Sequence, residues 1–138
     1  MKEIKKVLIA NRGVPAVRIM NTCRDKRIKT VAIYSTPDRL AYHVFLADEA
    51  VHIGEAPPQE SYLNMEKIIK IALERGCDAI HSGWGFLAEN PDFAEMVEEA
   101  GLIWVGPPAN VIRLMGDKIR AKKIAQRANI PTIPALLK

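Results

Sequence analysis

The stretch VLIANRG, residues 7–13, joins a short apolar run to a polar turn, and three other apolar runs are built in a similar way. These are VAIY (31–34), DAIH (78–81) and LIWVG (102–106). None of the four shows the strict alternation of apolar and polar residues that is typical of a strand with one face in water. We therefore expect strands that are buried on both faces, as in a parallel sheet covered by helices.

Helical patterns with end signals lie between these runs. A helix is predicted over 65–75, where apolar residues recur on one stripe and a glycine follows. A second helix is expected to begin after an N-cap at Asn90 and to end at Gly101, and the first crossover is predicted over 15–25. The alternation of strands and helices predicts right-handed crossovers and a three-layer, doubly wound α/β domain with a mainly parallel sheet.

Length and composition favour one globular domain. The chain has 138 residues, of which 49% are hydrophobic, and no window approaches the roughly 18 consecutive apolar residues of a membrane span. The basic N-terminus is interpreted as the first strand, not a secretion signal, in a cytoplasmic or organelle-matrix protein. Cys23 and Cys77 lack the spacing of a metal or redox motif and are predicted to be reduced thiols in or near the core.

The positive charge is concentrated near the C-terminus. Residues 113–138 carry seven basic and one acidic side chain, whereas residues 1–112 carry 13 basic and 15 acidic ones. Because the cations alternate with Ile, Ala and Leu at helical spacing, a solvated helix face is favoured over a nucleic-acid arm. Binding of phosphate by these cations is a third possibility.

The polar segments after the strands mark the candidate site, because ligands of doubly wound sheets bind beyond the carboxyl ends of the strands. These segments are NRG (11–13), STPDR (35–39), HSGWGF (81–86) and VGPP (105–108). The first lacks the glycines of a dinucleotide fingerprint, and no phosphate loop of the Walker type is present. Gly13 fits a tight turn, Arg12 is either a surface charge or an ion-pair partner, and Arg18 is either a surface residue or an interface residue.

In the third segment, Trp84 stands between two glycines. It is either a core residue or a platform for a ligand, and Gly85 would let a ligand approach the backbone. Glu89 precedes the Asn90 cap, where the positive end of a helix favours an anion, and this electrostatic role is the favoured reading.

Lys118 follows a glycine and a capping residue, Asp117, at the start of a further helical stretch. A lysine has the wrong sign for the helix dipole at that position. The mismatch would be explained by a phosphate bound to the ammonium and to free backbone N–H groups.

Taken together, the segments resemble the N-terminal domain of biotin carboxylase, the ATP-grasp component of acetyl-CoA, pyruvate and propionyl-CoA carboxylases. The matching segments are KVLIANRG, AVRI, KTVAIYSTPDR, HVFLADEAVHIG, SYLN, AIHSGWGFLAENPDFA, IWVGPP and IRLMGDK. The resemblance implies a Rossmann-like pre-ATP-grasp domain over residues 1–115, with residues 116–138 beginning the connection to an ATP-grasp domain. The chain departs from the family pattern at Val14, Pro15 and Trp84.

The resemblance also implies a chemistry. The family uses Mg-ATP and bicarbonate to form carboxyphosphate and then carboxylates biotin. Lys118 matches a lysine that contacts ATP, Trp84 and Gly85 match positions facing the biotin and bicarbonate pocket, and Glu89 matches a nearby carboxylate. The Mg²⁺ ligands and catalytic side chains of the family lie beyond position 138, so these residues alone are expected not to turn over ATP.

The implied partners are a biotin carboxyl carrier protein, a carboxyltransferase component and a second copy in a two-fold dimer. The implied location is the cytoplasm, or the mitochondrial matrix or plastid in a eukaryote, with no membrane and no nucleic-acid role. Two alternatives stay open: a stand-alone nucleotide- or phosphate-binding module, and a dimerisation module without catalysis.

Overall fold

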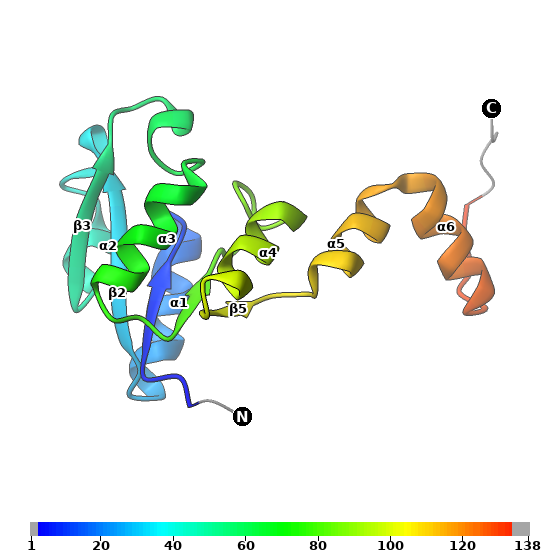
Figure 1. Ribbon diagram of the computed structural model, residues 1–138, viewed down its shortest axis with the longest axis horizontal. Coiled ribbons are helices and arrows are strands. Elements are labelled where there is room, and N and C mark those ends of the chain that lie inside the picture. The colour runs from blue at the N-terminus through cyan, green and yellow to red at the C-terminus, as the bar shows by residue number, and fades with distance from the viewer. Residues whose placement is uncertain (1–2, 134–138) are drawn as a thin grey trace.

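The computed structural model describes residues 3–133 and contains a five-stranded sheet in the order β3-β2-β1-β4-β5 (Figure 1). The strands are β1 (Lys6–Ile9), β2 (Lys29–Ser35), β3 (Glu49–Gly54), β4 (Ala79–His81) and β5 (Ile103–Val105). The α-helices are α1 (Gly13–Asp25), α2 (Tyr42–Leu46), α3 (Met65–Glu74), α4 (Pro91–Glu99), α5 (Ala109–Gly116) and α6 (Lys118–Arg127). Every strand pair is parallel, as expected.

The central strand β1 is buried on both faces. Leu8 and Ala10 point into one apolar cluster, which α3 and α4 cover, whereas Val7 and Ile9 point into a second cluster, which α1 and α2 cover. Successive side chains of a strand point to opposite faces, so one uninterrupted apolar run supplies both cores. The predicted three-layer α/β fold is confirmed.

Four helices end in the same cap. The residue after the last turn takes a left-handed φ, and the next N–H bonds back to the helix, which is the Schellman arrangement. The left-handed residues are Arg27, Gly76, Gly101 and Asn129. The closing bonds run from Ile28, Cys77, Leu102 and Ile130 to the carbonyls of Cys23, Ala72, Val97 and Ala125. At the first three ends the next strand begins one or two residues later, so these helix-to-strand turns are very short.

The edge strand β3 and the helix α2 were not among the predicted elements. The strand β3 lies at the sheet edge, and most of its side chains alternate between exposed and partly buried positions. The helix α2 has only five residues. Helix α1 begins at Gly13, two residues before the predicted start, and Gly13 has a left-handed φ of +58° at this turn.

Helix α5 leaves the sheet, and one of its arginines pairs with two carboxylates of α4. Arg113 lies between Asp92 and Glu95 of α4, with an Nη2–Oδ1 distance of 2.7 Å to Asp92 and an Nη2–Oε2 distance of 2.7 Å to Glu95. Figure 1 shows α6 at the far end of the long axis from the sheet, and none of its residues is buried. The expected division between 115 and 116 falls at the end of α5 and stays a prediction, and residues 134–138 of the expected connection lie outside the described residues.

We expect Leu8→Ala to lower the free energy of unfolding by about 2–5 kcal/mol, because it leaves a cavity in a fully buried site. The measurement is urea denaturation followed by far-UV circular dichroism. Val14→Ala, at a side chain that is 75% exposed, is the matched control and should change stability by less than about 0.5 kcal/mol. Equal effects of the two substitutions would contradict the assignment of β1 to the centre of the core.

Candidate functional site

The order of the strands places the candidate site at the carboxyl ends of β1 and β4. These strands are neighbours, yet the chain winds from β1 toward β2 and β3 on one side and from β4 toward β5 on the other. Such a switch point leaves a crevice between the loops that leave the two strands. Here the loops are residues 10–12, after β1, and residues 82–90, after β4.

The side chain of Asn11 joins the two loops. It is 2% exposed, and its Nδ2 donates to the carbonyls of Ser82 at 2.7 Å and Trp84 at 2.8 Å. Its Oδ1 accepts from the backbone N–H of Arg12 at 2.8 Å. A buried amide that satisfies both donors and its acceptor fixes the groups around it.

The backbone of the 82–90 loop turns through unusual conformations. Gly83, Gly85 and Phe86 have φ values of +69°, +72° and +40°, and a φ in this range costs a residue other than glycine on the order of 1 kcal/mol or more. A Cβ at Gly83 would lie 2.9 Å from Nδ2 of Asn11. Gly83 is therefore required both by its φ and by the close approach of the amide.

The remainder of the loop is anchored beside Trp84. Phe86 stacks on Tyr62 with ring centroids 5.1 Å apart and an interplanar angle of 23°, and Leu87 is buried in the core. The Trp84 side chain, in contrast, is 71% exposed. The loop therefore presents one large aromatic ring to solvent from a fixed backbone, which favours the platform reading of Trp84 over the core reading.

A charged network lies next to this loop. Asp38 accepts hydrogen bonds from Nε of Arg12 at 2.6 Å, from the hydroxyl of Tyr62 at 2.6 Å and from Oγ of Ser35 at 3.2 Å, and Arg12 also reaches its second oxygen. Burial alone would raise the pKa of Asp38, but the hydrogen bonds from Arg12 and Tyr62 outweigh it and lower that pKa. Of the two readings of Arg12, the structure supports the ion-pair partner.

His43 lies beneath the start of α1. It is fully buried, and its Nδ1 accepts a long hydrogen bond of 3.4 Å from the N–H of Gly13, while Nε2 lies 3.3 Å from the carbonyl of Ile33. These partners assign the proton of a neutral imidazole to Nε2. Burial lowers the pKa of His43, so the ring is neutral at pH 7.

Asn11, Tyr62 and His43 were not predicted as site residues. Asn11 has a sequence signal, since it is the first polar residue after a buried strand at a predicted strand end. Tyr62 and His43 come from segments with no strand-end signal, and only the tertiary fold brings Tyr62 to Asp38 and His43 to Gly13.

The predicted site residues occupy two separate places. Trp84, Gly85 and Glu89 are exposed on the 82–90 loop, beside Arg12 and Gly13 through the Asn11 contacts, and Arg18 is exposed on α1. Lys118 is exposed at the first position of α6.

The resemblance assigns Lys118 and the 83–85 bend to one enzyme site, but the structure does not place them beside one hollow. Helix α5 carries the start of α6 away from the sheet along the long axis of the molecule (Figure 1). The buried residues of α5 belong to the apolar cluster that also contains residues of α4. Helix α6 has no buried residue that would hold it against the sheet.

The predicted use of free backbone N–H groups at Lys118 is also corrected. The side chain of Asp117 caps α6 and accepts from the N–H groups of Ile119 at 2.9 Å and Arg120 at 3.0 Å. Because these two donors are taken and the cap is itself an anion, the Lys118 ammonium is the group at this end that best suits an anion.

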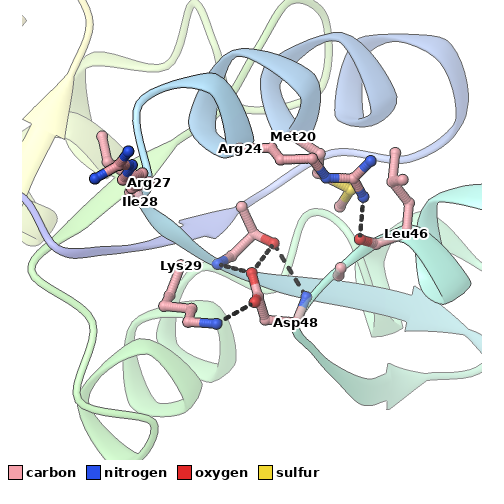
Figure 2. Close-up of a pocket in the computed structure, with 9 residues that line it drawn as sticks. Met20, Arg24, Arg27, Ile28, Lys29, Leu46 and Asp48 are labelled. Atoms are coloured by element: carbon pink, nitrogen blue, oxygen red, sulfur yellow. Dashed lines mark hydrogen bonds and ion pairs between the residues drawn. The ribbon is translucent and has the colours of Figure 1, made fainter.

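A hollow of about 280 Å³ lies at the amino ends of the strands, between the end of α1 and the start of β3. Figure 2 shows Asp48 at one side of this hollow, where it accepts hydrogen bonds from Lys29 and Thr30. Asp48 accepts from Nζ of Lys29 at 2.8 Å and from the N–H and Oγ of Thr30 at 2.9 and 3.0 Å, while Arg24 lies 3.4 Å from the carbonyl of Leu46. These hydrogen bonds link the start of β2 to the residue before β3, so the polar groups that line the hollow have a structural role.

Other kinds of site find no support in the part of the chain that the structure describes. Between residues 3 and 133 no group of three His, Cys, Asp or Glu side chains could hold a metal ion. Over the same residues no helix is long and apolar enough to cross a membrane. Cys23 and Cys77 are free and buried, as predicted, and burial raises the pKa of the Cys77 thiol to about 11.

Comparison with known proteins identifies relatives of this fold and loop. The family model "Biotin carboxylase, N-terminal domain" matches residues 3–112. A biotin carboxylase of Pseudomonas aeruginosa is 56% identical over 131 residues, which cover 95% of this chain and 29% of that protein. The propionyl-CoA carboxylase alpha chain of Ruegeria pomeroyi is 52% identical over 132 residues, which cover 96% of this chain and 19% of the relative.

A solved structure agrees with these sequence matches. The biotin carboxylase domain dimer of 2-oxoglutarate carboxylase from Hydrogenobacter thermophilus, in complex with MgADP, ADP and bicarbonate, superimposes with a TM-score of 0.91 at 50% identity. The match covers 97% of this chain and 29% of that one. The chain therefore spans less than a third of the length of these relatives.

The burial of His43 predicts a fall in stability below about pH 6.5. Its pKa is lowered in the folded state, so the unfolded chain binds more protons as the pH falls below the unfolded value of about 6.5, and the free energy of unfolding decreases. His81, whose pKa burial also lowers, adds to this slope, whereas Asp38, with its lowered pKa, contributes only below about pH 4.

Urea denaturation at several pH values between 5 and 7.5 tests this expectation. His43→Gln should give a smaller decrease in stability over this range than the unmodified chain. His52→Gln, which replaces an exposed histidine of β3, is the comparison variant. An unchanged slope in His43→Gln would contradict the prediction.

Proposed function

This chain belongs to the family of biotin carboxylase N-terminal domains, and from that membership we propose that it forms one wall of a site that carboxylates biotin with ATP and bicarbonate. The observation that carries the proposal is the anchored 82–90 loop at the switch point of the sheet, where ligands of such folds bind. The alignment to a biotin carboxylase, 56% identical over 131 residues, covers this loop.

Trp84 and Gly85 are proposed to face the biotin and bicarbonate pocket. The exposed indole offers an apolar face against which a flat ring can pack. An added Cβ at Gly85 would meet nothing within 4 Å, so its backbone is open to an approaching group. Glu89 lies on the same loop and supplies a carboxylate close to this surface.

Lys118 is proposed to bind a phosphate of ATP through its ammonium. The side chain is exposed at the start of α6 and is free of the helix cap that occupies the amides of Ile119 and Arg120. An ammonium neutralises the negative charge that phosphoryl transfer develops. ATP supplies the phosphoryl group that activates bicarbonate. Because Lys118 and Trp84 lie apart, we propose that the remainder of a longer chain closes the space between them.

The proposed partners follow from the same family. They are a biotin carboxyl carrier protein, a carboxyltransferase component and a second copy of the chain, since the relative from Hydrogenobacter thermophilus is described as a dimer. We propose that the protein works in the cytoplasm or in an organelle matrix.

A chimera tests the roles of the two places. The matching segment of the Pseudomonas aeruginosa biotin carboxylase is replaced by this chain, and ATP-dependent carboxylation of free biotin is measured. Lys118→Ala should raise the KM for ATP by about tenfold, because it removes a charge-assisted contact. Trp84→Ala should raise the KM for biotin by about tenfold and leave the KM for ATP unchanged.

Lys123→Ala is the control for the first variant, because it removes a second exposed cation of the same helix. It should change the KM for ATP by less than about twofold. A folded chimera whose KM for ATP responds equally to both lysine substitutions would contradict the proposed role of Lys118.

We expect the 138 residues on their own to release no phosphate above background from ATP in the presence of bicarbonate and biotin. The reason is that this chain spans less than a third of the length of the carboxylases it resembles. A phosphate-release assay checks this. Turnover that Lys118→Ala abolishes would contradict the expectation, whereas saturable binding of ATP without turnover would favour a binding module.

A further inference from the structure

We infer that Asn11 is the positioning residue for Trp84, so that a buried amide on β1 sets the direction of the exposed indole on the loop after β4. The inference rests on the proposed function only where it takes Trp84 as a wall of the biotin pocket. The hold of Asn11 on the loop is a property of the fold itself.

The amide bonds continue the pairing of β1 with β4 beyond the sheet. The strands are in register as far as Ile9 and His81, and the N–H of Ala10 donates to the carbonyl of His81 at 2.9 Å. The next two bonds come from the Asn11 side chain and reach the carbonyls of Ser82 and Trp84. These carbonyls lie on either side of Gly83, so the amide fixes the left-handed turn that leads into Trp84.

The indole depends on this backbone for its orientation. Over residues 3–133 the Trp84 ring has no aromatic stacking partner and no hydrogen bond, and 71% of the residue is exposed. Phe86 and Leu87 are anchored by their own side chains, on Tyr62 and in the core. Those anchors fix residues 86 and 87. Residues 82–84 are held by the Asn11 side chain and by a hydrogen bond of 3.0 Å that the N–H of Gly83 donates to Nδ1 of His81.

Only the short amide side chain of asparagine fits position 11. Aspartate has the same size but cannot donate to two carbonyls and would place a charge against both of them. Leucine would leave the carbonyls of Ser82 and Trp84 without this donor. Glutamine is one methylene longer, and Gly83 already approaches so closely that a Cβ there would lie 2.9 Å from Nδ2.

The test uses the whole chain labelled with 5-fluorotryptophan and ¹⁹F NMR. The chain has two tryptophans, exposed Trp84 and buried Trp104, and Trp84→Phe assigns the two resonances. In Asn11→Asp we expect the Trp84 resonance to narrow and to move toward the position of free 5-fluorotryptophan, because the ring gains local motion. The Trp104 resonance should keep its position, because it reports on the core beside Phe93.

Two further variants keep the result decisive. Thr30→Val removes a buried hydroxyl that makes two hydrogen bonds with Asp48 at the opposite edge of the sheet, and it should leave the Trp84 resonance unchanged. If Asn11→Asp does not fold, Asn11→Ser keeps a single donor and should release Trp84 in part. A Trp84 resonance that is unchanged in a folded Asn11 variant, or that responds equally to Thr30→Val, would overturn the inference.

The chimera separates this inference from the proposed function. Asn11→Ser should raise the KM for biotin and leave the KM for ATP unchanged, in parallel with the release of Trp84. If Trp84 is released and the KM for biotin stays the same, the role of Trp84 in the biotin pocket is overturned while the hold of Asn11 stands. If neither changes, the positioning role is overturned.

Discussion

The burial of β1 on both faces is the constraint on which the fold depends. Leu8 and Ala10 face one layer of helices, while Val7 and Ile9 face the other, so a run of four apolar residues belongs to two cores at once. A strand in that position must have a strand on each side, and here β2 and β4 take those places. The switch point, and with it the crevice at the carboxyl edge, follows from this central position.

The polar groups at that edge solve a local problem of the same strand. When β1 ends, its backbone leaves the sheet, and the groups around it are still largely buried. The Asn11 amide bonds the carbonyls of the neighbouring loop, and the Arg12 guanidinium pairs with the Asp38 carboxylate. No buried side-chain nitrogen or oxygen among residues 3–133 lacks a partner. The result is a rigid edge from which Trp84 and the half-exposed Arg12 face solvent. Rigidity of this kind favours a site that holds a ligand without rearrangement.

Much of the fold could be predicted because its signals are local. Uninterrupted apolar runs indicated four strands, and the caps at Asn90 and Gly101 are where the sequence predicts them. The edge strand β3 has no such run, since one of its faces is open and its side chains mostly alternate in exposure. The separation of Lys118 from Trp84 could not be predicted, because it depends on the direction in which α5 leaves α4. Arg113, which looks like an ordinary surface cation in the sequence, links the two helices, and the buried Ala109 and Ile112 of α5 pack in the same core cluster as α4.

The Schellman caps make the two ends of the parallel strands differ in their tolerance of insertions. At the amino edge, Arg27, Gly76 and Gly101 turn each helix into the next strand within a few residues, so an insertion there would break a cap and shift a strand register. At the carboxyl edge the loops are longer, and their strand ends are already fixed from below. New specificities within this architecture should therefore arise by lengthening or exchanging the loops at the carboxyl ends of the strands. The short turns at the amino ends should keep their length.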